Sequence, residues 1–349
     1  MELEPDFWRG RSVLLTGHTG FKGTWLALWL ECLGARVTGF ALAPDTEPSL
    51  FPLVAPRLTS VLGDIRDRGA LGKVVADARP EVVIHMAAQA LVRRSYADPL
   101  GTFESNVMGT AYLLDALRGA AGLRAVLVVT SDKVYLNRDT GVHFRENDAL
   151  GGADPYSASK SAAEMVAASW SQSFFAGAAP RLGTARAGNV IGGGDWAADR
   201  VVPDAWRAVM AGEALRLRHP DATRPWQHVL DSLNGYLVYV QALAAGGAVP
   251  MALNFGPDPG RSASVAALAD MLLTAWGGRP WHRDDGAAQP EKKHLSLDPG
   301  LAATVLGWRT RLSIDRAIAW TAEWYAAFRE GGAARDLCLR QIEAFQDLR

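Results

Sequence analysis

Short apolar runs recur through the first half of the chain, and stretches with apolar residues at helical spacing separate several of them. A short apolar run between turn residues is typical of a strand that is buried on both faces of a parallel sheet. The expected strands are residues 12–16, 36–40, 59–62, 82–85, 125–130 and 184–186, and the expected helices include residues 24–33, 99–117 and 156–175. This alternation predicts an α/β fold, a Rossmann-like doubly wound parallel sheet whose ligands lie at the carboxyl ends of its strands.

The second half of the chain is less regular. Residues 231–244 have the pattern of a helix, residues 251–256 that of a strand, and glycines mark loops at 192–196 and 277–280. We therefore expect a larger domain over residues 1–188, onto which residues 231–256 pack back, and a smaller C-terminal lobe over residues 189–349.

Composition and charge exclude several classes of function. The net charge of the 349 residues is −1, so we expect no nucleic acid partner. No apolar run reaches the roughly 18 residues of a membrane span, and the N-terminal residues lack the pattern of a signal peptide. Cys32 and Cys338 make no disulfide framework, so we expect a cytoplasmic protein. The seven histidines show no metal-ligand spacing, and we expect no metal.

A glycine-rich turn follows the first expected strand. The sequence TGHTGFKG at 16–23 lies between that strand and an apolar helical stretch, which is the order that a dinucleotide-binding turn requires. Gly17 suits the tight turn, Gly20 lets the backbone approach a pyrophosphate, and Gly23 allows close helix packing. The unpaired N–H groups at the start of the helix would then face the phosphates.

Tyr156 and Lys160 stand four residues apart in an expected helix, so their side chains share one face. An ammonium beside a phenol favours the phenolate and lowers the phenol pKa. Such a phenol can take a proton from a substrate hydroxyl near neutral pH, while a dinucleotide accepts the hydride. The sequence therefore predicts an enzyme that oxidises a carbinol.

Three polar residues, Ser131, Asp132 and Lys133, follow the expected strand at 125–130. One interpretation is a helix cap with a solvated lysine. The other is an acid and a base that face the same substrate as Tyr156, and we favour it because the triplet lies at a strand end. A plain alcohol dehydrogenase has no use for the added pair, so a second proton transfer is expected after the oxidation.

Six motifs resemble the extended short-chain dehydrogenase/reductase family. They are TGHTGFKG at 16–23, DIRD at 64–67, HMAAQ at 85–89, TSDKVY at 130–135, PYSASK at 155–160 and RAGNVIGGGDW at 186–196. Within that family they are most similar to the CDP-glucose 4,6-dehydratases. The resemblance covers most of the chain, and the triplet at 131–133 indicates the type of reaction better than it indicates the nucleotide.

The resemblance implies a mechanism. Tyr156 would deprotonate the sugar 4-hydroxyl, to which Ser131 donates a hydrogen bond, while hydride passes from C4 to NAD. A base would then remove the C5 proton, Asp132 would protonate the departing 6-hydroxyl, and the hydride would return to C6. Lys133 stands where many relatives have a glutamate, so it is either the C5 base or an electrostatic stabiliser of the enolate.

The resemblance also implies ligand contacts, an NAD-binding domain at 1–188, a sugar-nucleotide-binding lobe at 189–349 and pairing into a homodimer or higher homo-oligomer. The implied cofactor contacts are Gly17, Thr19, Gly20, Phe21, Gly23, Asp64, Ile65, Ala87, Ala88, Gln89, Asn106, Tyr156 and Lys160. The implied contacts with the nucleotide-sugar substrate, of which CDP-glucose is favoured, are Arg94, Ser95, Asn189 and Arg224. No basic residue directly follows the expected strand at 36–40 to hold a 2′-phosphate, which favours NAD.

Three alternatives stay open. A 4-epimerase would use Ser131, Tyr156 and Lys160 alike, but it has no use for Asp132. A 4,6-dehydratase could instead act on another nucleotide sugar. The third alternative is a dinucleotide-sensing regulatory protein with an inactive site. Such a protein would not need the polar side chains that this chain retains at Ser131, Asp132, Tyr156 and Lys160. For Arg224, the competing interpretation is a surface salt bridge.

Overall fold

The computed structural model describes residues 2–177, 180–260, 262–284 and 292–348, and a seven-stranded parallel sheet forms its centre. The sheet has the strand order β11-β6-β5-β4-β1-β2-β3, and every neighbouring pair is parallel. Its strands are β1 (Ser12–Thr16), β2 (Arg36–Ala41), β3 (Thr59–Leu62), β4 (Val82–His85), β5 (Ala125–Val129), β6 (Arg181–Ala187) and β11 (Ala252–Phe255). The prediction of a doubly wound parallel sheet is confirmed, because β1 lies inside the sheet and the strand order runs outward from it in both directions.

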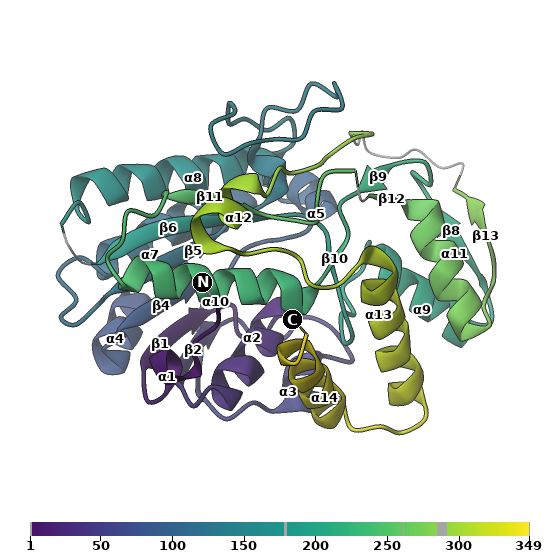
Figure 1. The fold of residues 1–349 in the computed structure, drawn as a ribbon, viewed down its shortest axis with the longest axis horizontal. Helices are drawn as coiled ribbons and strands as arrows, with labels where there is room; N and C mark the ends of the chain where they lie inside the picture. The colour runs from purple at the N-terminus through teal and green to yellow at the C-terminus, as the bar shows by residue number, and fades with distance from the viewer. Residues whose placement is uncertain (1, 178–179, 261, 285–291, 349) are drawn as a thin grey trace.

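Helices cover both faces of the sheet (Figure 1), and alternate residues of its central strands enter two different cores, one on each face. In β1, Val13 and Leu15 join the core beneath helices α2 (Phe21–Cys32) and α10 (Val229–Ala244), whereas Leu14 joins the core on the other face. The second core also receives side chains from α4 (Arg68–Ala78), α7 (Gly109–Ala116) and α8 (Pro155–Ser173). Burial on both faces explains why β4 and β5 consist almost entirely of apolar residues.

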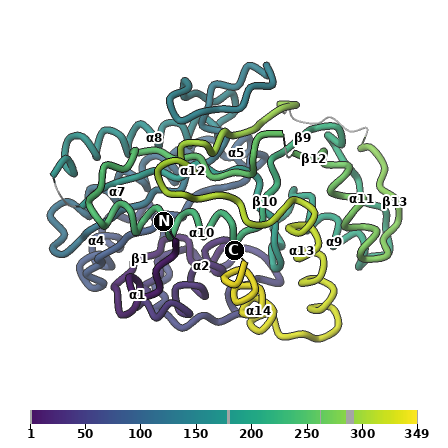
Figure 2. The backbone as a smooth tube through the Cα atoms, in the orientation of Figure 1, coloured from purple at the N-terminus to yellow at the C-terminus, as the bar shows by residue number. Residues whose placement is uncertain are grey.

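A second body of short strands and helices lies beside the sheet (Figures 1 and 2). Its two-stranded pairs are β7 (Val190–Ile191) with β10 (Gln227–His228), β8 (Ala214–Leu217) with β13 (Arg279–Arg283), and β9 (Thr223–Arg224) with β12 (Ala263–Ser264). Its main helices are α9 (Val201–Ala211), α11 (Val265–Trp276) and α13 (Ile314–Arg329). Trp206, Trp276 and Tyr325 contact one another through their rings and form the centre of its core.

Elements from late in the chain also pack on the central sheet and on the helices that flank it. The strand β11 pairs with β6, and α10 packs on β5 and β6. The helix α14 (Ala334–Gln346) packs against α2 and against α3 (Leu50–Val54), so the last helix of the chain lies beside two helices from its first 54 residues (Figure 2). An ion pair of 2.6 Å between Arg335 and Glu31 joins α14 to α2. The division into domains at 1–188 and 189–349 stays a prediction.

The structure differs from the expected elements in four places. The strand expected at 184–186 begins three residues earlier, because β6 spans Arg181–Ala187. The helix expected at 99–117 is α6 (Pro99–Phe103), a π-helical turn η1 (Glu104–Met108) and α7. The helix α2 begins three residues before the expected start at Thr24. The loop expected at 277–280 is wrong in its second half, because Gly277 ends α11 with a positive φ and β13 begins at Arg279.

The short helices are α1 (Pro5–Trp8), α5 (Val92–Ala97), η2 (Asp132–Val134) and α12 (Gly300–Leu306). No helix in the described ranges has both the length and the apolar character that crossing a bilayer requires.

Candidate active site

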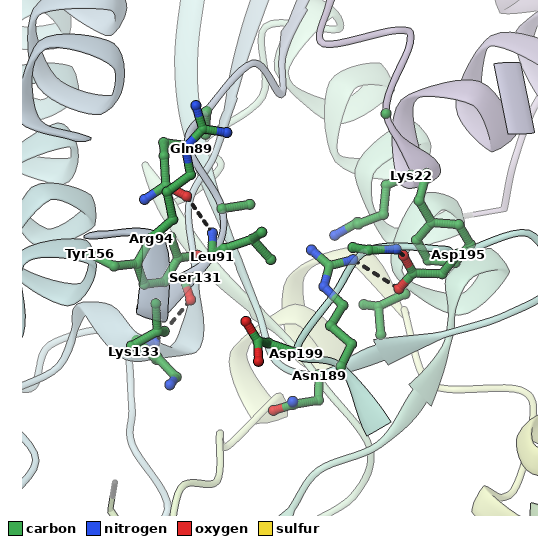
Figure 3. Close-up of a pocket in the computed structure, with 18 of the residues that line it drawn as sticks. Lys22, Gln89, Leu91, Arg94, Ser131, Lys133, Tyr156, Asn189, Asp195 and Asp199 are labelled. Carbon is green, nitrogen blue, oxygen red and sulfur yellow. Dashed lines mark hydrogen bonds and ion pairs between the residues drawn. The ribbon is translucent and has the colours of Figure 1, made fainter. Parts of the chain in front are cut away.

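A cavity of about 1190 Å³ lies along the carboxyl ends of the central strands and extends to the second body (Figure 3). A typical cavity for one small ligand has roughly 300–1,000 Å³, so this one has space for a dinucleotide and a second ligand. The predicted site residues that line it are Gly17, Thr19, Gly20, Phe21, Gly23, Asp64, Ile65, Ala87, Ala88, Gln89, Arg94, Ser131, Asp132, Lys133, Tyr156, Lys160, Asn189 and Arg224.

The glycine turn has the shape that the sequence predicts. Gly17 has φ +79°, and a Cβ there would lie 2.7 Å from the amide nitrogen of Ala87. A Cβ on Gly23 would lie 2.0 Å from the carbonyl oxygen of Gly17. Gly20 is the N-cap of α2, and no side chain caps the first amides of that helix. These amides suit the pyrophosphate of a dinucleotide, so the turn fits such a cofactor.

Ser131, Asp132 and Lys133 lie where β5 ends and η2 begins. The Ser131 hydroxyl donates to Asp132 Oδ1 over 3.1 Å and accepts from the backbone N–H of Lys133 over 3.2 Å. Asp132 is buried, and its Oδ2 has no hydrogen-bond partner in the described part of the chain. Burial raises the pKa of Asp132, against the lowering effects of Lys133, Ser131 and Arg224. A carboxyl with a raised pKa suits the role of a proton donor.

Tyr156 and Lys160 share one face of α8, as predicted, and both line the cavity. The N-cap Asp154 fixes the start of this helix by accepting from the N–H of Ser157 over 2.9 Å. The Lys160 ammonium donates to the carbonyl of Val129 over 3.1 Å. Burial lowers the pKa of Lys160 to about 8 and is opposed by the negative charge of Glu164.

The expectation that Lys160 lowers the pKa of Tyr156 is wrong for this structure. Burial raises the pKa of Tyr156 to about 12, which a hydrogen bond with Ser131 and the positive charge of Arg200 oppose. Asp132 raises it further. The desolvation of the phenolate therefore outweighs the opposing effects of Ser131 and Arg200 on this pKa.

Two predicted contact residues, Ser95 and Asn106, are not among the residues that line the cavity and are buried behind it. Ser95 accepts from the backbone N–H of Tyr156 over 3.1 Å. Asn106 accepts from the N–H of Gln89 over 2.8 Å and donates to the Gln89 carbonyl over 3.0 Å. Ser95 therefore positions Tyr156 and Asn106 positions Gln89, and direct contact of either residue with a ligand stays a prediction.

The predicted substrate residues differ in their surroundings. Arg224 is only 3 % exposed, so the alternative of a surface salt bridge is wrong. Its guanidinium donates to the carbonyls of Thr223, Lys292 and Lys293 at 2.7, 2.9 and 3.2 Å. Arg94 is 58 % exposed at its side chain and lies 3.9 Å from Asp45. The carbonyl of Asn189 accepts from Gln227, which joins β7 to β10.

The sequence analysis missed several charged residues of the cavity. The first is Lys22, which projects into the cavity from the side opposite Tyr156 (Figure 3) and donates to the hydroxyl of Tyr236 over 2.8 Å. Arg200 forms an ion pair of 2.9 Å with Asp195. Lys22 could have been found, because it lies within the glycine turn that the sequence assigns to the cofactor, but no local signal separates Arg200 from a surface arginine.

A second charged group, also missed, joins the two bodies at the edge of the cavity. Asp199 accepts from Arg93 over 2.7 Å and from Arg218 over 2.8 Å. Arg93 belongs to α5 and Arg218 follows β8. No group of three or more potential ligand side chains that could hold a metal ion occurs among the residues described.

A comparison of the sequence with protein families identifies this chain. The sequence model described as "NAD dependent epimerase/dehydratase family" matches residues 13–256, which is more than half of the chain. The chain belongs to this family.

Other members of the family resemble it over nearly their whole length. The CDP-glucose 4,6-dehydratase of Salmonella typhimurium is 43 % identical over 338 residues, which are 94 % of each chain. A solved dTDP-glucose 4,6-dehydratase of Streptomyces venezuelae with NAD bound has a TM-score of 0.78 and 26 % identity, over 92 % of this chain and 98 % of its own. A solved UDP-glucose 4-epimerase of Thermotoga maritima has a TM-score of 0.79 and 22 % identity, over 91 % of this chain and 99 % of its own. This likeness supports the fold.

Proposed function

We propose that this member of the family is a CDP-glucose 4,6-dehydratase, which converts CDP-glucose to CDP-4-keto-6-deoxyglucose and water with NAD as a retained cofactor. The single observation that carries the choice of a dehydratase is the buried carboxyl of Asp132 beside Ser131 and Tyr156, since an epimerase needs no acid there. The 43 % identity to the Salmonella typhimurium enzyme supports CDP-glucose as the substrate.

The residues present fit NAD. The glycine turn and the first amides of α2 would hold the pyrophosphate, Asp64 and Ile65 would flank the adenine, and the backbone segment 87–89 would line the middle of the cofactor. When bound, NAD accepts a hydride from the sugar C4, later returns it to C6, and brings a positive charge that favours the phenolate of Tyr156. Asn106 would support this arrangement through its two hydrogen bonds to the backbone of Gln89.

Tyr156 performs the first proton transfer in this proposal. It takes the proton of the sugar 4-hydroxyl as the C4–H bond breaks, and Ser131 orients the same hydroxyl. Lys160, held against the carbonyl of Val129, contributes a positive charge on the same helix face. The resulting 4-ketone acidifies the proton on C5, which prepares the second transfer.

Asp132 performs the second proton transfer. The C5 proton leaves, the C6–O bond breaks, and Asp132 supplies the proton with which the 6-hydroxyl departs as water. Lys133 lines the same cavity and fits two roles, removal of the C5 proton or stabilisation of the enolate. Single-turnover incorporation of deuterium at C5 by a Lys133→Met variant separates them, because loss of the base stops exchange and loss of a stabiliser only slows it.

The second body of the protein supplies two of the proposed contacts with the nucleotide sugar. Asn189 and Arg224 line the cavity from this body, whereas Arg94 lines it from α5. Arg224 suits a pyrophosphate because a guanidinium forms paired, charge-assisted hydrogen bonds. Its backbone partners hold the guanidinium in place before any ligand binds.

Incubation of the protein with NAD and CDP-glucose tests the function. Formation of a product with the ultraviolet absorbance of a 4-keto-6-deoxy sugar is expected, and parallel reactions with dTDP-glucose and UDP-glucose should be slower. A faster reaction with dTDP-glucose or UDP-glucose would show that the preferred substrate carries another nucleotide than CDP. Interconversion of UDP-glucose and UDP-galactose without loss of water would instead support a 4-epimerase.

We further propose a cytoplasmic homodimer or higher homo-oligomer. Both cysteines, Cys32 and Cys338, are free thiols, which suits a reducing compartment. The large apolar side chains of Leu100 on α6 and Met165 on α8 are 77 % and 58 % exposed, which suits pairing through these helices. Light scattering at several protein concentrations measures the oligomeric state, and a monomer at all of them would contradict the pairing.

A further inference from the structure

The ring of His85, the last residue of β4, has a partner at each of its two nitrogens. Its Nδ1 lies 2.7 Å from the hydroxyl of Thr16, and its Nε2 lies 3.0 Å from the hydroxyl of Thr110. All three residues are buried. Thr16 ends β1 directly before the glycine turn, and Thr110 lies at the start of α7. The ring therefore joins the end of the first strand to a helix that flanks the sheet.

The neighbouring groups fix the direction of these hydrogen bonds. The Thr16 hydroxyl accepts from the backbone N–H groups of Met86 and Ala87, both over 3.1 Å. Its own proton is therefore left for Nδ1 of His85. Burial lowers the pKa of His85 to about 3, so the ring is neutral near neutral pH. A neutral ring that accepts at Nδ1 carries its proton on Nε2, and this N–H donates to Thr110.

The hydrogen-bond network continues into the π-helical turn η1. The Thr110 hydroxyl donates to the carbonyl of Asn106 over 2.7 Å. A bond of this kind, four residues back along a helix, is common and by itself implies no function. Here, however, it ends on the residue whose side-chain amide holds the backbone of Gln89 from both its N–H and its carbonyl.

The same amide reaches the helix that carries Tyr156. A second N–H of Asn106 donates to the hydroxyl of Ser159 over 2.9 Å, and this hydroxyl donates to the carbonyl of Tyr156 over 2.7 Å. Gln89 and Tyr156 lie on the same side of the cavity (Figure 3). The network thus runs without a break from the end of β1 to both of them, and bonds arranged in one direction strengthen one another.

We propose that His85 and Thr110 are positioning residues for the hydride transfer. Neither is among the described residues that line the cavity. They hold Asn106, and Asn106 holds both the backbone of Gln89 beside the cofactor and the start of α8 with Tyr156.

The proposal rests on the NAD-dependent reaction proposed above. In its first step the C4–H bond breaks, a hydride passes to the dinucleotide, and the proton of the 4-hydroxyl passes to Tyr156. The rate of this step depends on the distance between groups that Asn106 positions. A misplacement of about 1 Å can slow such a step by roughly 100-fold.

Thr110→Val tests the proposal, because valine has nearly the shape of threonine but no hydroxyl. The N–H of His85 then loses its acceptor, and the carbonyl of Asn106 loses its donor. We expect kcat for CDP-glucose, per site that binds NAD, to fall about tenfold or more, while the KM for CDP-glucose stays within about twofold of the parent value. Calorimetric titration with NAD counts the sites, so a smaller folded fraction does not imitate the effect.

Two further variants make the test specific. Thr110→Ser keeps the hydroxyl and should restore the parent kcat. Thr321→Val removes a matching bond, because this buried threonine of α13 donates to the carbonyl of Ala317 over 2.7 Å. It should affect the melting temperature about as much as Thr110→Val but leave kcat per site unchanged. Thr110→Ala and Thr321→Ala form the same comparison if valine prevents folding.

The ¹⁵N resonances of the His85 ring in the parent protein give a readout that does not depend on turnover. They should be those of a neutral ring with its proton on Nε2 from about pH 5 to about pH 8, and their absence from His85→Gln assigns them. A proton on Nδ1 would contradict the direction of the network and the proposal with it. An unchanged kcat per site in Thr110→Val, or a loss that serine does not restore, would also overturn it. Absence of turnover in the parent would instead contradict the proposed function.

Discussion

The hydroxyl of Ser131 donates to one carboxylate oxygen of Asp132 and leaves the other oxygen, buried, without a partner in the described part of the chain. Gly188 makes room for that second oxygen, because a Cβ there would lie 3.0 Å from it. Asp132 thus lines the cavity with a buried carboxyl whose pKa is raised and whose second oxygen is free to hold a proton. Such an oxygen can carry a proton to a departing hydroxyl.

Asp132→Asn should separate oxidation from elimination. The side chain keeps its shape, and Ser131, Tyr156 and Lys160 remain, so the sugar C4 can still be oxidised. An amide cannot donate its proton to the departing oxygen at a useful rate, so bound NADH should accumulate while little 4-keto-6-deoxy product forms. Stopped-flow absorbance of NADH and product analysis measure the two steps.

Asp77→Asn, on the exposed end of α4, is the matched control and should behave like the parent. Product formation by Asp132→Asn at close to the parent rate would remove Asp132 from the mechanism and favour an epimerase.

Tyr156→Phe should keep the fold and the binding of NAD but reduce turnover by roughly 10²–10⁴-fold, which is the usual contribution of a general base. The ring still packs in its buried position, and only the hydroxyl is lost. Steady-state kinetics and calorimetry with NAD measure the two effects. Tyr112→Phe on α7, a tyrosine that does not line the cavity, is the control. Near-parent turnover of Tyr156→Phe would contradict its assignment as the base.

Arg224→Lys should weaken the binding of CDP-glucose much more than that of NAD. Lysine keeps the positive charge but loses the planar fork that now contacts three backbone carbonyls. Separate calorimetric titrations with the two ligands give the comparison. Arg118→Lys replaces an exposed arginine just after α7 and is the control for the replacement of arginine by lysine. If both ligands bind less tightly by the same factor, Arg224 does not act on the substrate.

Asp231 should make the protein less stable as the pH rises. Burial raises the pKa of this carboxyl from 3.8 to about 7, although it accepts hydrogen bonds from the N–H groups of Arg311 and Leu312. Between about pH 4 and pH 7 the folded state therefore binds more protons than the unfolded state, and the stability contributed by this group falls across that window.

Asp231→Asn has no such proton to lose. The melting temperature of the variant relative to the parent should therefore rise from about pH 4 to about pH 7. Calorimetric melting at several pH values measures the difference. A constant difference across the window would show that Asp231 does not titrate as its burial indicates.

The strands and the catalytic helix could be predicted because their signals are local. The apolar runs of β1 and β4 are buried on both faces, and the spacing of Tyr156 and Lys160 alone places them on one face of α8. The resemblance supplied the cavity-lining residues beyond these, including Asn189 and Arg224.

The remaining features depend on contacts between distant parts of the chain. Lys22 donates a hydrogen bond to Tyr236, which lies 214 positions away in the sequence, and no local pattern predicts this contact. The raised pKa of Tyr156 follows from burial by the whole assembled site, whereas the sequence showed only its neighbour Lys160. Asn106 faces Gln89 from a π-helical turn that interrupts an otherwise regular helix.

The contact of α14 with α2 ties the dinucleotide turn to a segment made much later in synthesis. Arg335 and Glu31 are 304 positions apart, and Phe345 packs edge-to-face on Trp29. During synthesis on the ribosome, α2 therefore leaves the ribosome long before α14, and the apolar face that α14 covers stays exposed until then. A chain that stops before residue 334 would keep every glycine of the dinucleotide turn but would lack the contacts of α14 with α2, the helix that follows this turn. Docking of α14 therefore completes the packing of the helix that follows the dinucleotide turn.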